Sequence, residues 1–491
     1  MITTFQEFEK HVADRAKWLG KAISQYMKSD EYEIALEADQ YEKQQNTKIN
    51  SYVRKLYDIT GVTSVDFTNP NNRIASNFFH RLITQRVSYS LGAGVSFANK
   101  KEVKQKDLST KVVDSTKELL GNDFDDILYD TAYSAEKHGV CYCFCNGDEY
   151  YVFPMTEFLP FRDEYSGKIR AGVRFWCLEW KKRPVIVDLY EEDGYSRYMT
   201  KDGKYGLGAL ELVQQKKAYI LKVDETDADG EEIVGGENYM VDGQITIPFA
   251  VMYANKNKQS ALIGMKANID AYDMIQSGFA NDLSECAQMY WIIDNAAGMD
   301  ENDITRLRDR MLLQHIVVAD QQNSSITPYA QDVPYQSREA CLNKIKENIY
   351  ADFGALDVKN IGAGANVTAT EIRAAYQTMD EEADRFEYQV NQFIQQILAL
   401  KGVKDDYPMF DRNRVGNQKE ETEMVMLAAP YLDDETILRK LPFISVDEIG
   451  AIMAKRDMET ASRTKIEQSL TENEDDEQDN EGIEKEEESE E

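Results

Sequence analysis

The residues of this chain that could do chemistry lie apart from one another. Cys141, Cys143 and Cys145 alternate along the sequence, so a β-strand would place their three thiols on one face. Zinc sites instead favour C-x-x-C knuckles, in which two thiolates converge on the ion. No second cysteine cluster follows, and free cysteine is among the most buried residue types. The alternation therefore favours small apolar side chains packed beneath a sheet over a metal site.

The motifs of common nucleotide-binding and hydrolytic enzymes are absent from the sequence. It contains no G-x-x-x-x-G-K-[ST] run and no G-x-S-x-G elbow, and its four histidines form no H-x-x-x-H pair. Gly362-Ala363-Gly364 is a fragment of a dinucleotide fingerprint, but it follows a helical pattern and lacks the third glycine. We therefore expect no catalytic residue, no metal and no cofactor, and we predict that the chain is not an enzyme.

Net charge is the strongest compositional feature. The sequence has 56 Lys and Arg against 88 Asp and Glu, a net charge of −32. Residues 469–491 hold 13 acidic side chains and one Lys, which leaves −20 for the rest of the chain. Proteins that grip nucleic acid by neutralising phosphates show a basic excess instead. The charge excludes a broad DNA-gripping surface, but it allows a protein that lets DNA pass without holding it.

The hydropathy pattern predicts no membrane span and no secretory signal. The longest nearly apolar stretch, Ile247–Ala254, has eight residues, whereas a spanning helix needs roughly 20. Met1–Lys10 has neither the basic start nor the apolar stretch of a signal peptide. We expect an intracellular protein whose six cysteines are reduced thiols.

Apolar spacing predicts a helical opening followed by a β-rich middle. Between Ile74 and Val87 the apolar residues form one helix face, which ends before two glycines. At Gly139 the period changes from 3.6 to 2, and Asn146-Gly147 predicts a hairpin with a type I′ turn. Asp193-Gly194 marks a second hairpin. The acidic, Gly-containing segment 224–238 is expected to be a solvated loop.

A long helical pattern returns near Gln259. Its apolar residues occupy two heptad positions, interrupted only at Gln276: Leu262, Ile269 and Leu283 on one, and Met265, Tyr272, Phe279 and Cys286 on the other. Such a narrow seam favours a second helix beside it, from this chain or a neighbouring one. We further predict strands at 290–293, 315–319 and 407–411. Helices are predicted at 301–314 and at 336–352. A longer helix is predicted from a capping box at Thr368–Glu371 to near Gly402, and further helices follow up to about residue 468.

Several segments carry a family pattern when they are read in order. Asn72–Phe79 followed by Val87–Gly92 is similar to an N-R-I helix leading to Y-x-x-G, and Lys137–Tyr142 and Phe153–Phe158 are similar to parts of a β-rich domain. The most specific match is Ile247–Asn255 followed by Ile269–Asp273, which is similar to an I-P-F strand and an I-D-x-Y-D helix. Together these segments resemble the portal proteins of long-tailed, siphophage-type double-stranded DNA bacteriophages.

The resemblance implies an α+β portal fold, with an α/β wing, a helical stem, a small α/β clip, a tunnel loop with a long helix, and a helical crown. The implied boundaries are wing 1–258, first stem helix 259–288, clip 289–334, second stem helix 335–352, tunnel loop 353–367, long wing helix 368–402, crown 403–468 and a disordered acidic tail 469–491.

The resemblance also implies a function. The chain would form a homo-oligomeric ring, of twelve copies, at one capsid vertex of the virion, after assembly in the host cytoplasm. The ring would serve as the head-to-tail connector and as the channel for packaging and ejecting double-stranded DNA. The implied partners are the large subunit of the terminase, the major capsid and scaffolding proteins, and a head completion or adaptor protein, with no membrane involved.

Site residues follow from the same resemblance. Asp357, Val358, Lys359 and Asn360 would line the DNA channel in the tunnel loop, with Lys359 and Asn360 making the few DNA contacts. Lys344 and Lys346 either line the channel along the stem or are solvated. Tyr290 and Trp291 either contact partners at the clip or are buried inside it, since exposed aromatic residues often anchor interfaces.

Two other classes of protein remain as alternatives. A packaging-associated, metal-dependent nuclease would need converging carboxylates on the β-rich middle, and the predicted strands show none at matched positions. A structural or scaffold coiled-coil protein would use the heptad seam to form rods rather than rings. A monomeric helical protein with an incidental seam is a further alternative that the same pattern allows.

Overall fold

A computed structural model gives the structure of the 491-residue chain. It describes residues 4–57, 61–67, 69–99, 114–177, 185–200, 207–226, 232–286, 290–293, 300–314, 326–329, 335–357, 369–412, 418–441, 443–444, 449–450, 452–456 and 458. The chain divides into two compact units, Met1–Val358 with Tyr376–Asn413 and Lys359–Ala375 with Arg414–Glu491. Each unit is described by itself.

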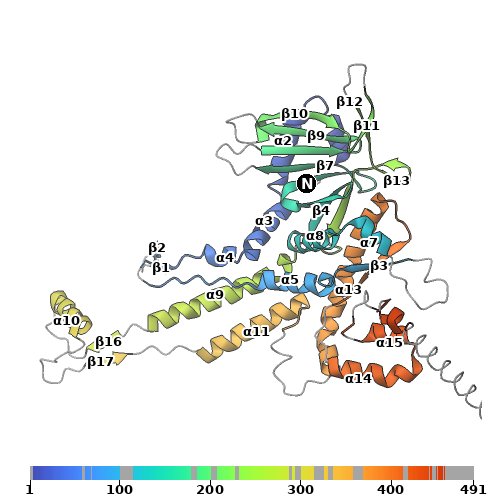
Figure 1. Ribbon diagram of the computed structural model, residues 1–491. Coiled ribbons are helices and arrows are strands. Elements are labelled where there is room, and N and C mark those ends of the chain that lie inside the picture. The colour runs from blue at the N-terminus through green and yellow to red at the C-terminus, as the bar shows by residue number, and fades with distance from the viewer. Residues whose placement is uncertain are drawn as a thin grey trace, which may run out of the picture. The chain divides into compact units, whose positions relative to one another are not determined.

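The first unit opens with helices, as the apolar spacing predicted (Figure 1). They are α1 (Phe5–Lys10), α2 (Arg15–Tyr26), α3 (Asp30–Glu42), α4 (Thr47–Asn50), α5 (Phe78–Leu91), α7 (Asp114–Leu120) and α8 (Phe124–His138). A hairpin of β1 (Lys55–Tyr57) and β2 (Thr63–Val65) interrupts them. At the beginning of α3 the Ser29 hydroxyl accepts a hydrogen bond from the Tyr32 amide, as expected for a serine N-cap.

Antiparallel sheets form the middle of the first unit. A five-stranded sheet has the order β10-β9-β8-β7-β6, and a three-stranded sheet has the order β15-β4-β5. The strands of the larger sheet are β6 (Phe158–Arg162), β7 (Ile169–Cys177), β8 (Val185–Glu191), β9 (Gly194–Thr200) and β10 (Leu210–Lys217). Those of the smaller sheet are β4 (Val140–Asn146), β5 (Glu149–Pro154) and β15 (Phe249–Tyr253). The mixed helix-and-strand fold was therefore predicted correctly.

Strand β4 is buried on both faces and separates two apolar cores. Cys141, Cys143 and Cys145 are at most 3% exposed and belong to the largest core, which the helices build. Tyr142 and Phe144 point the other way, into an aromatic cluster. The prediction that the alternating cysteines are packing residues is confirmed.

Two local predictions about the β-rich middle are wrong. In the β4–β5 hairpin Asn146 pairs with Glu149, so the turn residues are Gly147 and Asp148. Only Gly147 has a positive φ, of 64°, whereas a type I′ turn needs positive φ at both turn positions. The expected loop at 224–238 is largely a hairpin of β11 (Ile220–Thr226) and β12 (Glu232–Glu237), because cross-strand pairing outweighed the acidic composition.

Two long helices follow and contact each other along their length (Figure 1). They are α9 (Leu262–Cys286) and α11 (Tyr335–Phe353). Between them in the sequence lie β16 (Tyr290–Ile293), α10 (Glu301–Gln314) and β17 (Ile326–Tyr329), with β16 and β17 paired antiparallel. These elements match the predicted helices and the first predicted strand, whereas the strand predicted at 315–319 lies outside the described residues.

The predicted heptad seam of α9 is correct only in its first half. Leu262, Met265 and Ile269 are buried in the largest core. Beyond them Leu283 is 53% exposed, and the buried positions belong to polar residues instead. Asp273, Ser277 and Asn281 are 0%, 2% and 6% exposed, because polar groups of other segments pack against them.

Helix α13 (Ala369–Leu400) has 32 residues, which corresponds to about 48 Å at 1.5 Å per residue. Its residues from Tyr376 onward belong to the first unit. There Phe386, Val390 and Phe393 are buried in the largest core. The helix ends before Gly402, as predicted, and β18 (Asp406–Phe410) then pairs with β3 (Val95–Asn99). Thr368, the first residue of the predicted capping box, lies outside the described residues.

The described part of the second unit is helical. It contains α14 (Gln418–Ala428), a short 3₁₀ turn at Ala429–Tyr431, and α15 (Asp434–Lys440). The Asp433 carboxylate caps α15 by accepting from the Thr436 amide at 3.1 Å. The predicted acidic tail, 469–491, lies outside the described residues.

Candidate functional site

Of the four predicted channel residues, the structure describes only Asp357. Val358, Lys359 and Asn360 lie outside the described residues. The Asp357 carboxylate is 2.5 Å from the Lys346 ammonium group, which also lies 5.6 Å from the centre of the Tyr350 ring. Lys346, predicted either to line the channel or to be solvated, is therefore held within its own chain beside the segment that precedes 358–368.

The other predicted residues lie apart from Asp357. The Lys344 side chain is 70% exposed and pairs with Glu347 at 3.3 Å, one turn further along α11. Tyr290 and Trp291 begin β16, opposite Tyr329 and Pro328 of β17. Their roles in a channel or an interface stay predictions.

The C-terminus of α11 fixes the backbone immediately before 358–368. Gly354 adopts φ +67°, its amide donates to the Ala351 carbonyl at 3.1 Å, and the Ala355 amide donates to the Tyr350 carbonyl at 2.9 Å. This pair of bonds is a Schellman motif, which satisfies helix carbonyls that would otherwise lack donors. The chain therefore leaves α11 in one defined direction.

Side chains from α5 hold this helix end in place. The Arg81 guanidinium donates to the Tyr350 hydroxyl at 3.1 Å, and the Gln85 amide donates to the Leu356 carbonyl at 3.0 Å. Arg81 and Gln85 are four residues apart and so share one face of α5. One helix face thus bonds to α11 and to the residues that follow it.

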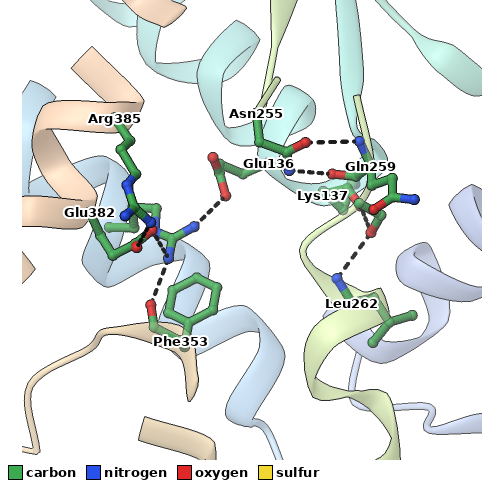
Figure 2. A network of polar contacts seen from close by, with 10 residues as sticks. Glu136, Lys137, Asn255, Gln259, Leu262, Phe353, Glu382 and Arg385 are labelled. Atoms are coloured by element: carbon green, nitrogen blue, oxygen red, sulfur yellow. Dashed lines mark hydrogen bonds and ion pairs between the residues drawn. The ribbon is translucent and has the colours of Figure 1, made fainter. Parts of the chain in front are cut away.

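Arg86, the next residue of α5, joins α11, α8 and α13. Figure 2 labels its partners Phe353, Glu136 and Glu382. Its guanidinium donates to the Phe353 carbonyl at 2.6 Å and lies 3.8 Å from the centre of the Phe353 ring. The same group pairs with Glu136 of α8 at 3.1 Å and with Glu382 of α13 at 3.5 Å. A planar guanidinium can serve all of these partners at once, which a lysine ammonium cannot do as well.

Glu136 is the least solvated member of this group. Its side chain is 2% exposed. Burial raises the pKa of the Glu136 carboxyl, Arg86 opposes that rise, and Glu382 adds to it. A buried carboxylate of this kind is tolerated because a guanidinium bonds to it directly.

Helix α5 also contacts the residues that follow 358–368. The Tyr89 hydroxyl donates to the Asp380 carboxylate of α13 at 2.6 Å, and the rings of Tyr89 and Tyr376 stack at 5.9 Å. Arg412 reinforces this part of α13 by pairing with three of its carboxylates, those of Asp380, Asp384 and Glu387.

We call Arg81, Gln85, Arg86 and Tyr89 the α5 support, because they bond to both sides of 358–368.

The start of α9 is attached to the end of α8 (Figure 2). The Ser260 hydroxyl donates to the Lys137 carbonyl at 2.6 Å and accepts from the Leu262 amide at 3.1 Å. The Ala261 amide donates to the Glu136 carbonyl at 3.1 Å. These donors satisfy the last carbonyls of α8 and fix where α9 begins.

The described residues contain no group of three His, Cys, Asp or Glu side chains that could hold a metal ion. Among the described histidines, His138 is buried and lies 2.8 Å from Asp39. Although burial opposes it, His138 and Lys137 together lower the pKa of Asp39 to about 2. This cluster links α3 to α8. Within the described part of the chain, no helix is long and apolar enough to cross a membrane.

Sequence reasoning missed the α5 support. Arg81, Gln85 and Arg86 stand inside a segment recognised by its apolar face, so they looked like its solvated side. Glu136 was likewise one of many acidic residues. A usable signal was present, since Arg86 follows the apolar Ile83 by three residues and so lies at the edge of the buried face.

Solved structures that match part of this chain come from gene transfer agent (GTA) particles. One is the neck of an empty GTA particle computed with C6 symmetry, with a TM-score of 0.40 and 12% identity, covering 74% of this chain and 88% of that one. Another is the virion of the native particle, with a TM-score of 0.39 and 12% identity, covering 73% and 88%.

Two curated proteins are similar in sequence. The portal protein of Bacillus phage SPP1 is 23% identical over 419 residues, which cover 80% of this chain and 78% of the relative. The portal protein of Clostridium phage phiCD119 is 24% identical over 452 residues, which cover 85% and 93%. Residues 32–479 match the family described as phage portal protein, SPP1 Gp6-like. Because this match extends over most of the chain, from within α3 past the described end of the second unit, the protein belongs to the SPP1 Gp6-like family of phage portal proteins.

Proposed function

We propose that this chain is one subunit of a portal ring at a capsid vertex, through which double-stranded DNA is packaged and later ejected. The observation that carries the proposal is the family match over residues 32–479. In this role the protein is a structural component and not an enzyme. Its place is in the virion, after assembly in the host cytoplasm.

The parts of the portal are assigned along the chain on the basis of element order. Helices α9 and α11, with the block β16–α10–β17 between them in sequence, support the order of stem, clip and stem. The sheets and helices before α9 then form the wing, and 353–367 is the tunnel loop. The α5 support bonds to the residues on either side of 358–368, which suits a loop that must be presented from a fixed base.

The acidic composition supports passage of DNA rather than retention. A wall that neutralised many phosphates would bind the duplex tightly and slow its movement. A net charge of −32 per chain favours a surface from which DNA is repelled. Few cations are then needed, and Lys359 is the only Lys or Arg among residues 353–367.

The expected partners are the other subunits of the ring, the terminase large subunit, the major capsid and scaffolding proteins, and a head completion protein. In this proposal, the elements β16, α10 and β17 form the clip, which contacts the terminase motor and later the completion protein. Tyr290 and Trp291 remain our candidates for that contact.

The oligomeric mass of the purified protein tests the proposed function. One chain has a mass of 56.2 kDa, so twelve copies give about 670 kDa. Light scattering should report a species of that order, and particle images should show rings. Because heterologous contacts close only at suitable concentration and ionic strength, several salt and magnesium conditions are needed. A monomer under all of them, or rods, would contradict the proposal, and rods would favour the coiled-coil alternative.

A Lys359→Glu variant tests the DNA contact. Reversing the single cation of 353–367 should lower the DNA content of assembled particles or their retention of DNA, because a weak phosphate contact becomes a repulsion. The measurement is DNA per particle after purification. Lys404→Glu is the matched control, since Lys404 is 71% exposed and pairs only weakly with the exposed Asp242. Normal DNA content and retention in the Lys359 variant would contradict a DNA contact by Lys359.

The nuclease alternative is tested separately. Purified protein incubated with linear duplex DNA and magnesium or manganese should leave the DNA intact. Cleavage that disappears on addition of a chelator would support the nuclease, and it would point to carboxylates that the described residues do not bring together.

A further inference from the structure

A row of polar side chains on α9 binds a segment that is neither helix nor strand. The acceptors are Asp273, Ser277 and Asn281, spaced four residues apart on one face of the helix. The donors are the alternate amides of Asn72, Ile74 and Ser76, in the segment that leads into α5. We call the three acceptors the α9 ladder.

Each rung of the ladder is a direct hydrogen bond. The Asn72 amide donates to Asn281 Oδ1 at 2.6 Å, the Ile74 amide donates to Ser277 Oγ at 2.9 Å, and the Ser76 amide donates to Asp273 Oδ1 at 2.9 Å. Four residues of a helix rise about 6.0 Å, and two residues of an extended chain rise about 6.6 Å. The two repeats are nearly equal, so three successive rungs can form in one register.

The ladder is buried, which makes its register specific. The three acceptors are at most 6% exposed. Asp273 also accepts from the Asn46 side chain, which in turn donates to the Ser76 carbonyl at 3.1 Å. A buried amide that loses its acceptor is left without a hydrogen bond, which is unfavourable, and displacing the segment along α9 would break several such bonds together. Apolar packing alone would fix the register less sharply.

The segment that the ladder holds continues directly into α5. Phe78, the first residue of α5, lies between the two long helices, with its ring 5.0 Å from that of Tyr272 in α9 and 6.2 Å from that of Tyr350 in α11. Further along α5 stand the four residues of the α5 support. A continuous series of contacts therefore runs from α9, through 72–76, to the residues on both sides of 358–368.

We propose that Asp273, Ser277 and Asn281 are positioning residues that set the register of α5 on α9, and that through α5 they set the position of the segments flanking 358–368. This inference rests on the proposed function only for its consequence, namely that a displacement of the stem helix moves the base of the tunnel loop. The positioning itself is a property of the single chain.

Hydrogen exchange of the purified full-length protein, resolved to single amides, tests the ladder. In the wild type the amides of Asn72, Ile74 and Ser76 should exchange slowly. In a Ser277→Ala/Asn281→Ala variant the Asn72 and Ile74 amides should exchange about tenfold faster or more, as expected for the loss of one hydrogen bond each. Ser277→Thr, which keeps the hydroxyl, should restore slow exchange at Ile74.

The decisive readout is at a distance from the substitutions. The Gly354 and Ala355 amides, which close the end of α11, should also exchange faster in the double variant, because α5 no longer holds that end in register. Ser284→Ala is the control, since the Ser284 hydroxyl bonds back to the Ala280 carbonyl of its own helix at 2.9 Å. It should change none of these amides.

Two results would overturn the proposal. Fast exchange at Asn72, Ile74 and Ser76 in the wild type would show that the ladder does not hold. Faster exchange at 72–74 with unchanged exchange at 354–355 would show a local clamp that positions nothing beyond it. Because neither measurement needs rings or DNA, failure here is distinguishable from failure of the proposed function, which the oligomeric mass decides. Should the double variant fail to fold, Asn281→Ala alone removes only the end rung.

Discussion

Replacing Arg86 by methionine should lower the free energy of unfolding by about 3–5 kcal/mol, the range found when one partner of a buried ion pair is removed. The variant leaves the Glu136 carboxylate, 2% exposed, without its guanidinium. It also removes the donor to the Phe353 carbonyl and the bond to Glu382. Denaturant unfolding of the purified protein measures the loss, provided that wild type and variant are compared in the same oligomeric state.

Three companion variants separate the causes. Arg385→Met removes an arginine that is 75% exposed and also bonds to Glu382, and it should cost less than about 1 kcal/mol. Arg86→Lys keeps the charge but not the planar geometry, so its loss should be intermediate. Adding Glu136→Gln to Arg86→Met should recover part of the stability, because the buried charge is then gone. An Arg86→Met variant as stable as the Arg385→Met variant would refute the central role of Arg86.

The pH dependence of the Arg86→Met variant has a definite sign. Burial already raises the pKa of Glu136 in the wild type, and Arg86 opposes the rise. Without Arg86 the pKa of Glu136 in the folded variant should rise further, so the folded state keeps a proton that the unfolded chain releases. The stability of the variant should therefore improve as the pH falls from 8 to 5, and its deficit relative to wild type should shrink. A deficit that grows over that range would contradict this account.

Gly139→Ala should be as damaging as the loss of Arg86. Gly139 ends α8 with φ +96°, a conformation that costs a residue with a Cβ about 1–2 kcal/mol. A Cβ there would also lie 2.8 Å from backbone atoms of Lys258 and Gln259, just before α9. Backbone cannot move aside as a flexible side chain can, so we expect a loss of about 3 kcal/mol or more, or failure to accumulate folded protein.

Gly121→Ala is the matched control for this prediction. Gly121 follows α7 with φ +91°, and a Cβ there would meet nothing within 4 Å. The control should cost only the backbone term, about 1–2 kcal/mol. The difference between the two variants in denaturant unfolding measures the close approach of α8 to the start of α9. Equal losses would show that this approach is not restrictive.

The sequence predicted those parts of the fold that depend on periodicity. The helical opening, the change to strands after Gly139, and the helices α9, α10, α11 and α13 all follow from apolar spacing that tertiary packing reinforces. The alternating cysteines of β4 were predicted to pack beneath a sheet for the same reason. Family resemblance added the portal assignment, which apolar spacing alone does not specify.

The parts that were missed depend on contacts between distant segments. In α9 the residues Asp273, Ser277 and Asn281 looked like its solvated side, because their partners are amides some 200 residues earlier. Glu136 and Arg86 likewise reveal their pairing only when α5 and α8 pack together. Lys346 shows the same limit: the sequence left open whether it lines the channel or is solvated, and its contact with Asp357 is seen only in the structure.

The α9 ladder also constrains the two sides of one contact unequally. On the helix, three particular side chains must present an oxygen atom inward. On the facing segment only the main chain takes part, and every amino acid except proline supplies the same amide. Substitutions at 72, 74 and 76 therefore leave the rungs intact unless they introduce proline, whereas 273, 277 and 281 admit only a few residue types. Mutational tolerance across this contact is thus asymmetric, and a scan of the segment alone would underestimate its importance.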